Sequence, residues 1–135
     1  MNMLDESERL NRLVEKYPRV FAEATLPFGL QCGPGWDPLI ALLCEQLDLV
    51  LVRSGEGTIR VSQIKEKFGT LLFYYDPKGI DDCWLREISG VVEFFQMASQ
   101  RVCEVCGQPG KLRRKNWSRT ICESCAIAAS ISPDN

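Results

Sequence analysis

Apolar side chains recur at helical spacing in three stretches of the chain, which predicts three helices. The first begins near residues 5–7, where Asp and Ser are preferred capping types, and ends before Pro18. The second begins at Asp37, the expected N-cap, with a proline at the first helical position, and is apolar around much of its circumference. The third follows Asp81 and carries a stripe made of Trp84, Ile88, Val91, Val92 and Phe95.

Residues 58–75 alternate with a period of two, which predicts a β-hairpin with its turn at Gly69. Ile59 and Val61 set one phase of the alternation, and Ile64 begins another. Because a period of two cannot change phase without an inserted residue, we predict a bulge near residues 62–63. The second strand, residues 70–75, is apolar on both faces, so each face needs a cover. We expect helices on one face and the cysteine-rich segment or a partner on the other.

Two Cys-x-x-Cys pairs stand near the C-terminus, Cys103 with Cys106 and Cys122 with Cys125, separated by fifteen residues. This spacing is typical of structural zinc sites in which each pair forms a tight knuckle. Four thiolates saturate one Zn²⁺ and leave no position for water, so the expected role of the metal is structural. The alternatives are a redox dithiol and a pair of disulfides.

These patterns predict an α+β protein in which three helices pack on a β-hairpin, with a C-terminal four-Cys zinc ribbon. We expect residues 1–100 to form the core domain. The third helix runs directly into Cys103, so we expect residues 101–131 to form a zinc ribbon that packs on the core. Residues 132–135 are expected to be a frayed tail.

Composition indicates an ordinary globular protein, with 45% hydrophobic and 25% charged residues. The N-terminal residues are acidic, so no secretory signal is expected, and residues 38–52 are too interrupted by polar groups to span a membrane. Of seven cysteines, the zinc pattern leaves Cys32, Cys44 and Cys83 as free thiols, which indicates a reducing compartment. We therefore expect a cytoplasmic protein without membrane contact.

Catalytic equipment is sparse. The chain contains no histidine, and its glycine-rich segment follows no predicted strand, so it does not match a phosphate-binding loop. We expect no enzymatic activity and no small-molecule substrate. Cys32 lies in the glycine- and proline-rich loop at residues 26–36 and is the free thiol most open to being reactive, although free cysteines are usually buried.

The net charge of −2 hides an asymmetry between the two parts of the chain. Residues 1–100 carry more acidic than basic side chains, whereas residues 101–135 carry more basic ones. A basic run with an aromatic residue is typical of nucleic-acid contacts, since cations pair with phosphates and an indole stacks on a base. The other interpretation is that the cations balance the thiolates and the tryptophan covers the sulfurs. The residues concerned are Lys111, Arg113, Arg114, Lys115, Trp117 and Arg119.

Several motifs occur together and in a fixed order, and in combination they resemble a widespread family of small, uncharacterised proteins of phages, prophages and bacteria. They are Lys16-Tyr-Pro18, Cys32-Gly-Pro-Gly-Trp36, Gln63-Ile-Lys-Glu-Lys-Phe-Gly69, the Cys103–Arg113 segment and Trp117…Cys122-Glu-Ser-Cys125. The resemblance covers about residues 15 to 126. The chain departs from the family at Leu72, where an arginine is usual, and at residues 115–116, where glycines are common. The family has no established activity, so the resemblance implies only a mobile-element context, in which small proteins often bind and block another component.

The leading functional hypothesis is a non-enzymatic, zinc-stabilised protein-binding module. The resemblance suggests an inhibitor, for example an anti-defence protein, or an immunity-type factor of phage or prophage origin. Trp36 at the end of the glycine-rich loop, with Leu72 and Tyr74 on the two-sided strand, are the candidate contacts for a protein partner. The second hypothesis is a zinc ribbon that binds nucleic acid through residues 111–119.

Overall fold

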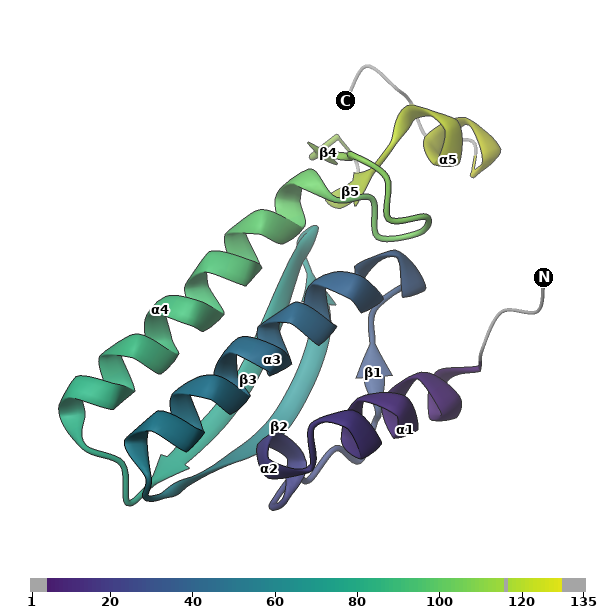
Figure 1. The fold of residues 1–135 in the computed structure, drawn as a ribbon. Coiled ribbons are helices and arrows are strands. Elements are labelled where there is room, and N and C mark those ends of the chain that lie inside the picture. Colours follow the sequence, from purple (N-terminus) through teal and green to yellow (C-terminus); the bar gives the residue numbers. More distant parts are fainter. Residues whose placement is uncertain (1–4, 116, 130–135) are drawn as a thin grey trace.

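A computed structural model describes residues 5–115 and 117–129 of the chain. Within these residues the fold mixes helices and small sheets (Figure 1). The helices are α1 (Glu6–Lys16), α2 (Pro18–Phe21), α3 (Asp37–Ser54), α4 (Asp82–Ala98) and α5 (Glu123–Ala128). The strands are β1 (Leu30–Gln31), β2 (Thr58–Lys67), β3 (Thr70–Lys78), β4 (Lys111–Arg113) and β5 (Arg119–Ile121). Two 3₁₀ turns, Pro34–Trp36 and Ser99–Arg101, precede α3 and follow α4.

The main sheet has the order β1-β2-β3, and α3 and α4 lie side by side across one of its faces (Figure 1). Strand β1 runs parallel to β2, and β2 runs antiparallel to β3. The core lies between this sheet face and the helices, and its fully buried side chains include Ile40, Leu43, Ile64, Leu71 and Ile88. The opposite face of β2 and β3 carries exposed or half-exposed side chains.

The predicted hairpin and its bulge are confirmed. Strands β2 and β3 pair from Thr58 to Lys78, and their register shifts between Val61 and Gln63. The turn consists of Phe68 and Gly69, and both have positive φ angles. Strand β3 continues beyond the predicted end at residue 75 and includes Pro77, because an edge strand tolerates a residue that cannot donate to the ladder.

The helix boundaries follow the predicted capping in part. Asp5 caps α1, since its carboxylate accepts the amide of Glu8 at 2.8 Å. Asp37 does not cap α3; it is the first helical residue, and its carboxylate instead accepts hydrogen bonds from Arg9 at 2.7–3.1 Å. The Arg9 side chain is largely buried, and a buried guanidinium requires a paired acceptor, so this ion pair takes the carboxylate away from the helix end.

The prediction of three helices on a hairpin is too simple. Three of the described helices, α1, α3 and α4, match the predicted ones, and α2 and α5 are additional short helices. The hairpin also gains a third strand, because two residues of the predicted loop pair with β2 as β1. Elements of two to six residues give no periodic signal, so the sequence pattern does not reveal them.

The cysteine-rich segment forms its own two-stranded sheet, β4-β5, followed by α5. The division of the chain near residue 100 stays a prediction. The expected frayed tail at residues 132–135 and the end of the 101–131 segment lie outside the described residues. In the part of the chain that the structure describes, no helix is both long enough and apolar enough to cross a membrane.

Candidate metal centre

The sulfur atoms of four cysteines cluster in the cysteine-rich segment. The Sγ atoms of Cys103, Cys106, Cys122 and Cys125 all lie within 4.8 Å of one another, and those of Cys106 and Cys122 are 3.7 Å apart. A tetrahedral ion with metal–sulfur bonds of about 2.3 Å places its sulfurs about 3.8 Å apart. The observed separations fit such an ion. The four predicted ligands therefore form a candidate metal site.

Each Cys-x-x-Cys pair sits on a tight backbone turn. After the first pair, Gly107 donates its amide to the carbonyl of Cys103 at 2.9 Å and adopts φ 82°, a left-handed conformation that favours glycine. In the second pair, Cys122 is the N-cap residue of α5, and its sulfur accepts the amide of Cys125 at 3.4 Å. Each turn thus directs both of its cysteines to the same side.

Burial, backbone hydrogen bonds and neighbouring sulfurs shift the pKa values of Cys103 and Cys125 in opposite directions. Burial raises the pKa of Cys103, but hydrogen bonds from the amides of Cys106, Cys122 and Val105 outweigh this effect and lower the pKa to about 7. Burial and the three neighbouring sulfurs raise the pKa of Cys125 to about 12. Cys103 therefore forms a thiolate easily, whereas Cys106 and Cys125, whose pKa values are raised, keep their protons. A cation with soft-ligand affinity can replace those protons, so the cluster is suited to a metal.

The glycine- and proline-rich loop at residues 26–36 packs directly against the backbone of the cysteine segment. Gly35 donates its amide to the carbonyl of Glu104 at 2.7 Å, and Gly33 donates to the Glu104 carboxylate at 2.8 Å. A Cβ atom at Gly35 would collide with the carbonyl oxygen of Cys103. Glycine is required here because the two backbones touch.

Trp36 is not a surface residue, and its prediction as a protein contact is wrong. Its side chain is 0% exposed, and its indole N–H donates to the carbonyl of Val102 at 2.8 Å. The close approach of the loop to the cysteine segment explains this burial, because the ring is enclosed between that segment and the helical core. Trp36 is an internal anchor of the fold.

The tip of the β2–β3 hairpin makes a second contact with the cysteine segment. The hydroxyl of Thr120 on β5 donates to the carbonyl of Gly69 at 2.5 Å, and both groups are buried. Added at Gly69, a Cβ atom would meet the side chain of Leu112 on β4. Contacts at the loop and at the hairpin tip thus hold the segment at two separate places.

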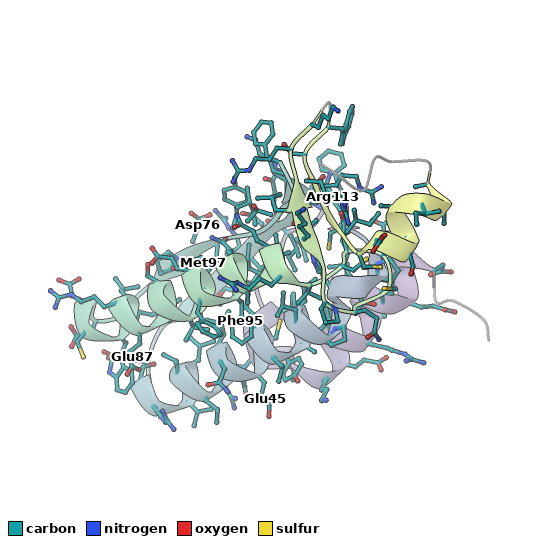
Figure 2. All side chains as sticks on the ribbon, turned by 90° about the horizontal axis from the view of Figure 1, so that it is seen from above. Glu45, Asp76, Glu87, Phe95, Met97 and Arg113 are labelled. Carbon is teal, nitrogen blue, oxygen red and sulfur yellow. The ribbon has the colours of Figure 1, made fainter. Side chains whose placement is uncertain are left out.

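The basic residues of this segment fall into two groups. Arg113, labelled in Figure 2, is 3% exposed, and its guanidinium donates to the carbonyl of Ile121 at 3.1 Å. Its prediction as a phosphate contact is therefore wrong, because its side chain is used inside the β4–β5 hairpin. Arg119 is half-buried. Exposed members of the set are Lys111, Arg114, Lys115 and Trp117, of which Trp117 is 75% exposed.

Leu72 and Tyr74 lie on the sheet face that the helices leave open. Tyr74 is exposed and Leu72 is half-buried, whereas Leu71 and Phe73 on the same strand point into the core. The expected cover for this second face is absent along most of β3 in the part of the chain that is described, because the cysteine segment reaches only the hairpin tip. Both side chains are accessible on this face, and their role as contacts for a protein partner stays a prediction.

The three remaining thiols differ in burial. Burial raises the pKa of Cys32 and that of Cys44 to about 12, whereas Cys83 is exposed on α4. At about pH 8 only a very small fraction of Cys32 or Cys44 is thiolate, and the thiolate is the reacting form. We expect a maleimide to modify only Cys83 rapidly in the native, metal-loaded protein, as mass spectrometry of a time course would record. Rapid labelling of Cys83→Ser at Cys32 would contradict this expectation.

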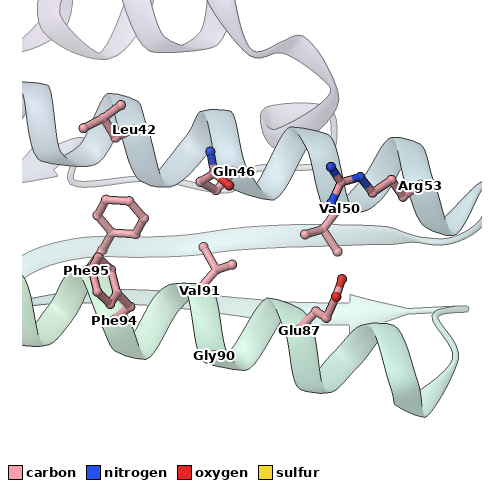
Figure 3. Close-up of a pocket in the computed structure, with 9 residues that line it drawn as sticks. All are labelled: Leu42, Gln46, Val50, Arg53, Glu87, Gly90, Val91, Phe94 and Phe95. Atoms are coloured by element: carbon pink, nitrogen blue, oxygen red, sulfur yellow. The ribbon is translucent and has the colours of Figure 1, made fainter.

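A groove between α3 and α4 was not predicted from the sequence. Nine residues from the two helices line a hollow of about 570 Å³ (Figure 3). Leu42 on α3 is 50% exposed and Phe94 on α4 is 66% exposed, and Met97 lies one turn further along α4 at 72% exposed (Figure 2). A helix that is apolar around most of its circumference carries more apolar surface than one core can cover, and α3 has this pattern. The apolar circumference of α3 was therefore the sequence feature that could have indicated an exposed apolar groove.

Comparisons with protein families, with characterised proteins and with solved structures find no match to this chain.

Proposed function

We propose that this chain is a non-enzymatic, zinc-stabilised module that binds another protein. Its four-cysteine site holds one structural Zn²⁺ in a zinc ribbon. The sulfur separations support this assignment, and a complete set of four thiolates favours zinc over ions that prefer oxygen ligands. When bound, the ion supplies no catalytic water and serves only to hold the two knuckles together.

The single observation that carries the protein-binding function is the groove between α3 and α4. Its floor contains Val50 and Val91, and its walls present the exposed Leu42 and Phe94. Large exposed apolar side chains that gather around one hollow are typical of interaction sites, because water around them is released when a partner covers them. The lining contains few ionisable groups, which suits binding more than catalysis.

Gly90 strengthens the argument. It lies in the middle of α4 and lines the groove, yet a Cβ atom at this position would meet nothing within 4 Å. Glycine inside a helix costs about 1 kcal/mol relative to alanine. No contact within the described chain requires a glycine at position 90. Because glycine has no side chain, the position leaves space in the groove for an atom of a partner.

The occupant that fits this groove is an amphipathic helix of the partner. Two antiparallel helices with apolar ridges accept a third helix through anchors at i, i+3, i+4 and i+7. Arg53 and Glu87 face each other across one end of the groove, and Leu42 and Phe94 stand toward the other (Figure 3). A bound helix would therefore place its apolar anchors near Leu42 and Phe94, and polar groups near the charged pair.

The resemblance to phage and prophage proteins suggests the setting. We propose an inhibitor, such as an anti-defence protein, or an immunity-type factor that covers a helix of its target. We also place the protein in the cytoplasm, since a thiolate metal site and three further free cysteines are best kept in a reducing compartment.

Filling the groove tests this function. Gly90→Leu places a side chain in the hollow and is expected to keep or raise the thermal midpoint, because leucine has the higher helix propensity. Tagged wild-type and variant proteins are incubated with nuclease-treated bacterial lysate, and the captured proteins are identified by mass spectrometry. We expect the wild-type protein to capture a partner that Gly90→Leu does not.

Gly90→Ala is the matched control, because it adds only a methyl group and should keep the partner. If the same proteins are captured by wild type and by Gly90→Leu, the groove is not the binding site. A wild-type homodimer that Gly90→Leu dissociates would show that a second copy fills the groove and would also contradict the proposal.

A further inference from the structure

The face of the sheet opposite α3 and α4 carries a row of aromatic and cationic side chains. Lys65 on β2 and Tyr74 on β3 share this face, and the ammonium of Lys65 lies 5.7 Å from the centre of the Tyr74 ring. Lys67 follows on the same face, because side chains alternate along a strand, and its ammonium lies 5.6 Å from the centre of the Phe68 ring. The ammonium groups of the two lysines therefore lie next to the rings of Tyr74 and Phe68 on this face.

Phe68 occupies a position that the fold does not favour for a large residue. It forms a two-residue turn with Gly69, with φ angles of 53° and 81°. Such turns favour Asn-Gly or Gly-Gly, because side chains other than these are strained at positive φ. The Phe68 side chain is 73% exposed, so packing within the described chain does not offset the strain. A ring held outward in a strained conformation indicates a role outside the fold.

Trp117 reaches the same end of the sheet from the segment between β4 and β5. Together with Lys67 and Phe68 it lines a surface hollow of about 420 Å³. Glu66 also lines this hollow, but its carboxylate accepts the amide of Gly69 at 2.7 Å. The exposed Arg114 and Lys115 lie in the same segment as Trp117. The hairpin tip and the cysteine segment thus bring rings and cations together at one place.

We propose that this open face, formed by Lys65, Lys67, Phe68, Tyr74 and Trp117, binds single-stranded nucleic acid. Bases stack on the three rings, and the phosphates between them pair with Lys65, with Lys67 and with the exposed Arg114. A duplex does not fit the same surface, because the faces of its bases are already stacked on one another. The recognition uses base faces and phosphates, so DNA and RNA strands of equal length should bind with similar affinity.

The chemistry of the face favours this occupant over an apolar peptide. An apolar partner would leave the ammonium groups of Lys65 and Lys67 buried without counter-charges, which is costly. A polyanion with flat bases satisfies the rings and the cations at once. The open face lies on the other side of the sheet from the α3–α4 groove, so this binding does not depend on the proposed protein partner.

Fluorescence anisotropy with the zinc-loaded 135-residue chain tests the proposal. The probes are labelled oligothymidylate and oligouridylate of about 12 nucleotides, a length within the usual site size for single-strand binding. We expect both to bind at about 50 mM salt, where electrostatic contacts are strong, and to dissociate as salt rises. Trp117→Ala and Phe68→Ala should each weaken binding by about fivefold or more, because each removes one stacking surface. Lys65→Glu/Lys67→Glu should weaken binding and flatten its salt dependence.

The control is Arg12→Glu/Arg86→Glu, which makes the same change in net charge on exposed positions of α1 and α4. This variant and Gly90→Leu should retain most of the affinity, because the substituted positions lie outside the proposed binding face. Circular dichroism and zinc content confirm that each variant is folded. Absence of binding by the wild-type protein would overturn the proposal. An equal loss in the control, or equal competition by duplex of the same length, would also overturn it.

Discussion

Cys122→Ser is expected to abolish zinc binding and to lower the thermal midpoint of unfolding by about 10 °C or more. Binding of zinc to a four-ligand site is worth about 10–16 kcal/mol in small peptides. Loss of even a few kcal/mol shifts the midpoint of a domain of this size by roughly 3–4 °C for each kcal/mol. The described part of the cysteine segment buries few apolar side chains of its own, namely those around Ile121 and Ala126, so its own apolar core contributes little to stability.

Cys83→Ser is the matched control for this experiment. It makes the same atomic change on an exposed face of α4, away from the sulfur cluster. Differential scanning calorimetry and metal analysis of both variants provide the measurement. Equal midpoints for the two variants would show that the cysteine cluster does not stabilise the fold through a metal.

Trp36→Ala should cost about 3–5 kcal/mol of unfolding free energy, the usual range for removing a fully buried aromatic ring. The ring fills space between the cysteine segment and the helical core, and its N–H satisfies the carbonyl of Val102. Trp36→Phe keeps most of the apolar volume but leaves that carbonyl without its donor, so it should cost about 1–3 kcal/mol. Urea unfolding followed by far-ultraviolet circular dichroism measures all three proteins.

Trp117→Ala is the comparison, because its side chain is 75% exposed. We expect it to change stability by less than about 0.5 kcal/mol, as is usual for surface positions. If Trp36→Ala lowered the unfolding free energy as little as Trp117→Ala does, Trp36 would lie at the surface. The packing of the 26–36 loop against the cysteine segment would then be refuted.

Features with a local cause were predictable from the sequence. The alternation of apolar residues changes phase between Val61 and Ile64, which requires a bulge whatever the hairpin packs against. The structure has this bulge. The two Cys-x-x-Cys turns depend on spacing and on Gly107, so their four sulfurs were also predictable as one cluster. The cap at Asp5 requires only the residues that follow it.

Features that depend on distant contacts were not predictable in this way. Trp36 and Arg113 look exposed in sequence because each lies beside glycine, proline or charged residues. Their burial depends on carbonyl groups that other segments bring to them, those of Val102 and Ile121. Asp37 has an ideal capping position, but Arg9, 28 positions earlier, binds its carboxylate. The groove beside Gly90 likewise exists only once α3 and α4 are paired.

Native mass spectrometry of the untreated protein tests the central structural claim most directly, namely that four thiolates hold one zinc ion. We expect one Zn²⁺ per chain, with the mass reduced by the protons that the thiols release on binding. We also expect the ion to be lost from Cys122→Ser and kept by Cys83→Ser. A metal-free chain whose mass shows two disulfides, or a chain that carries no metal with all thiols reduced, would contradict this claim.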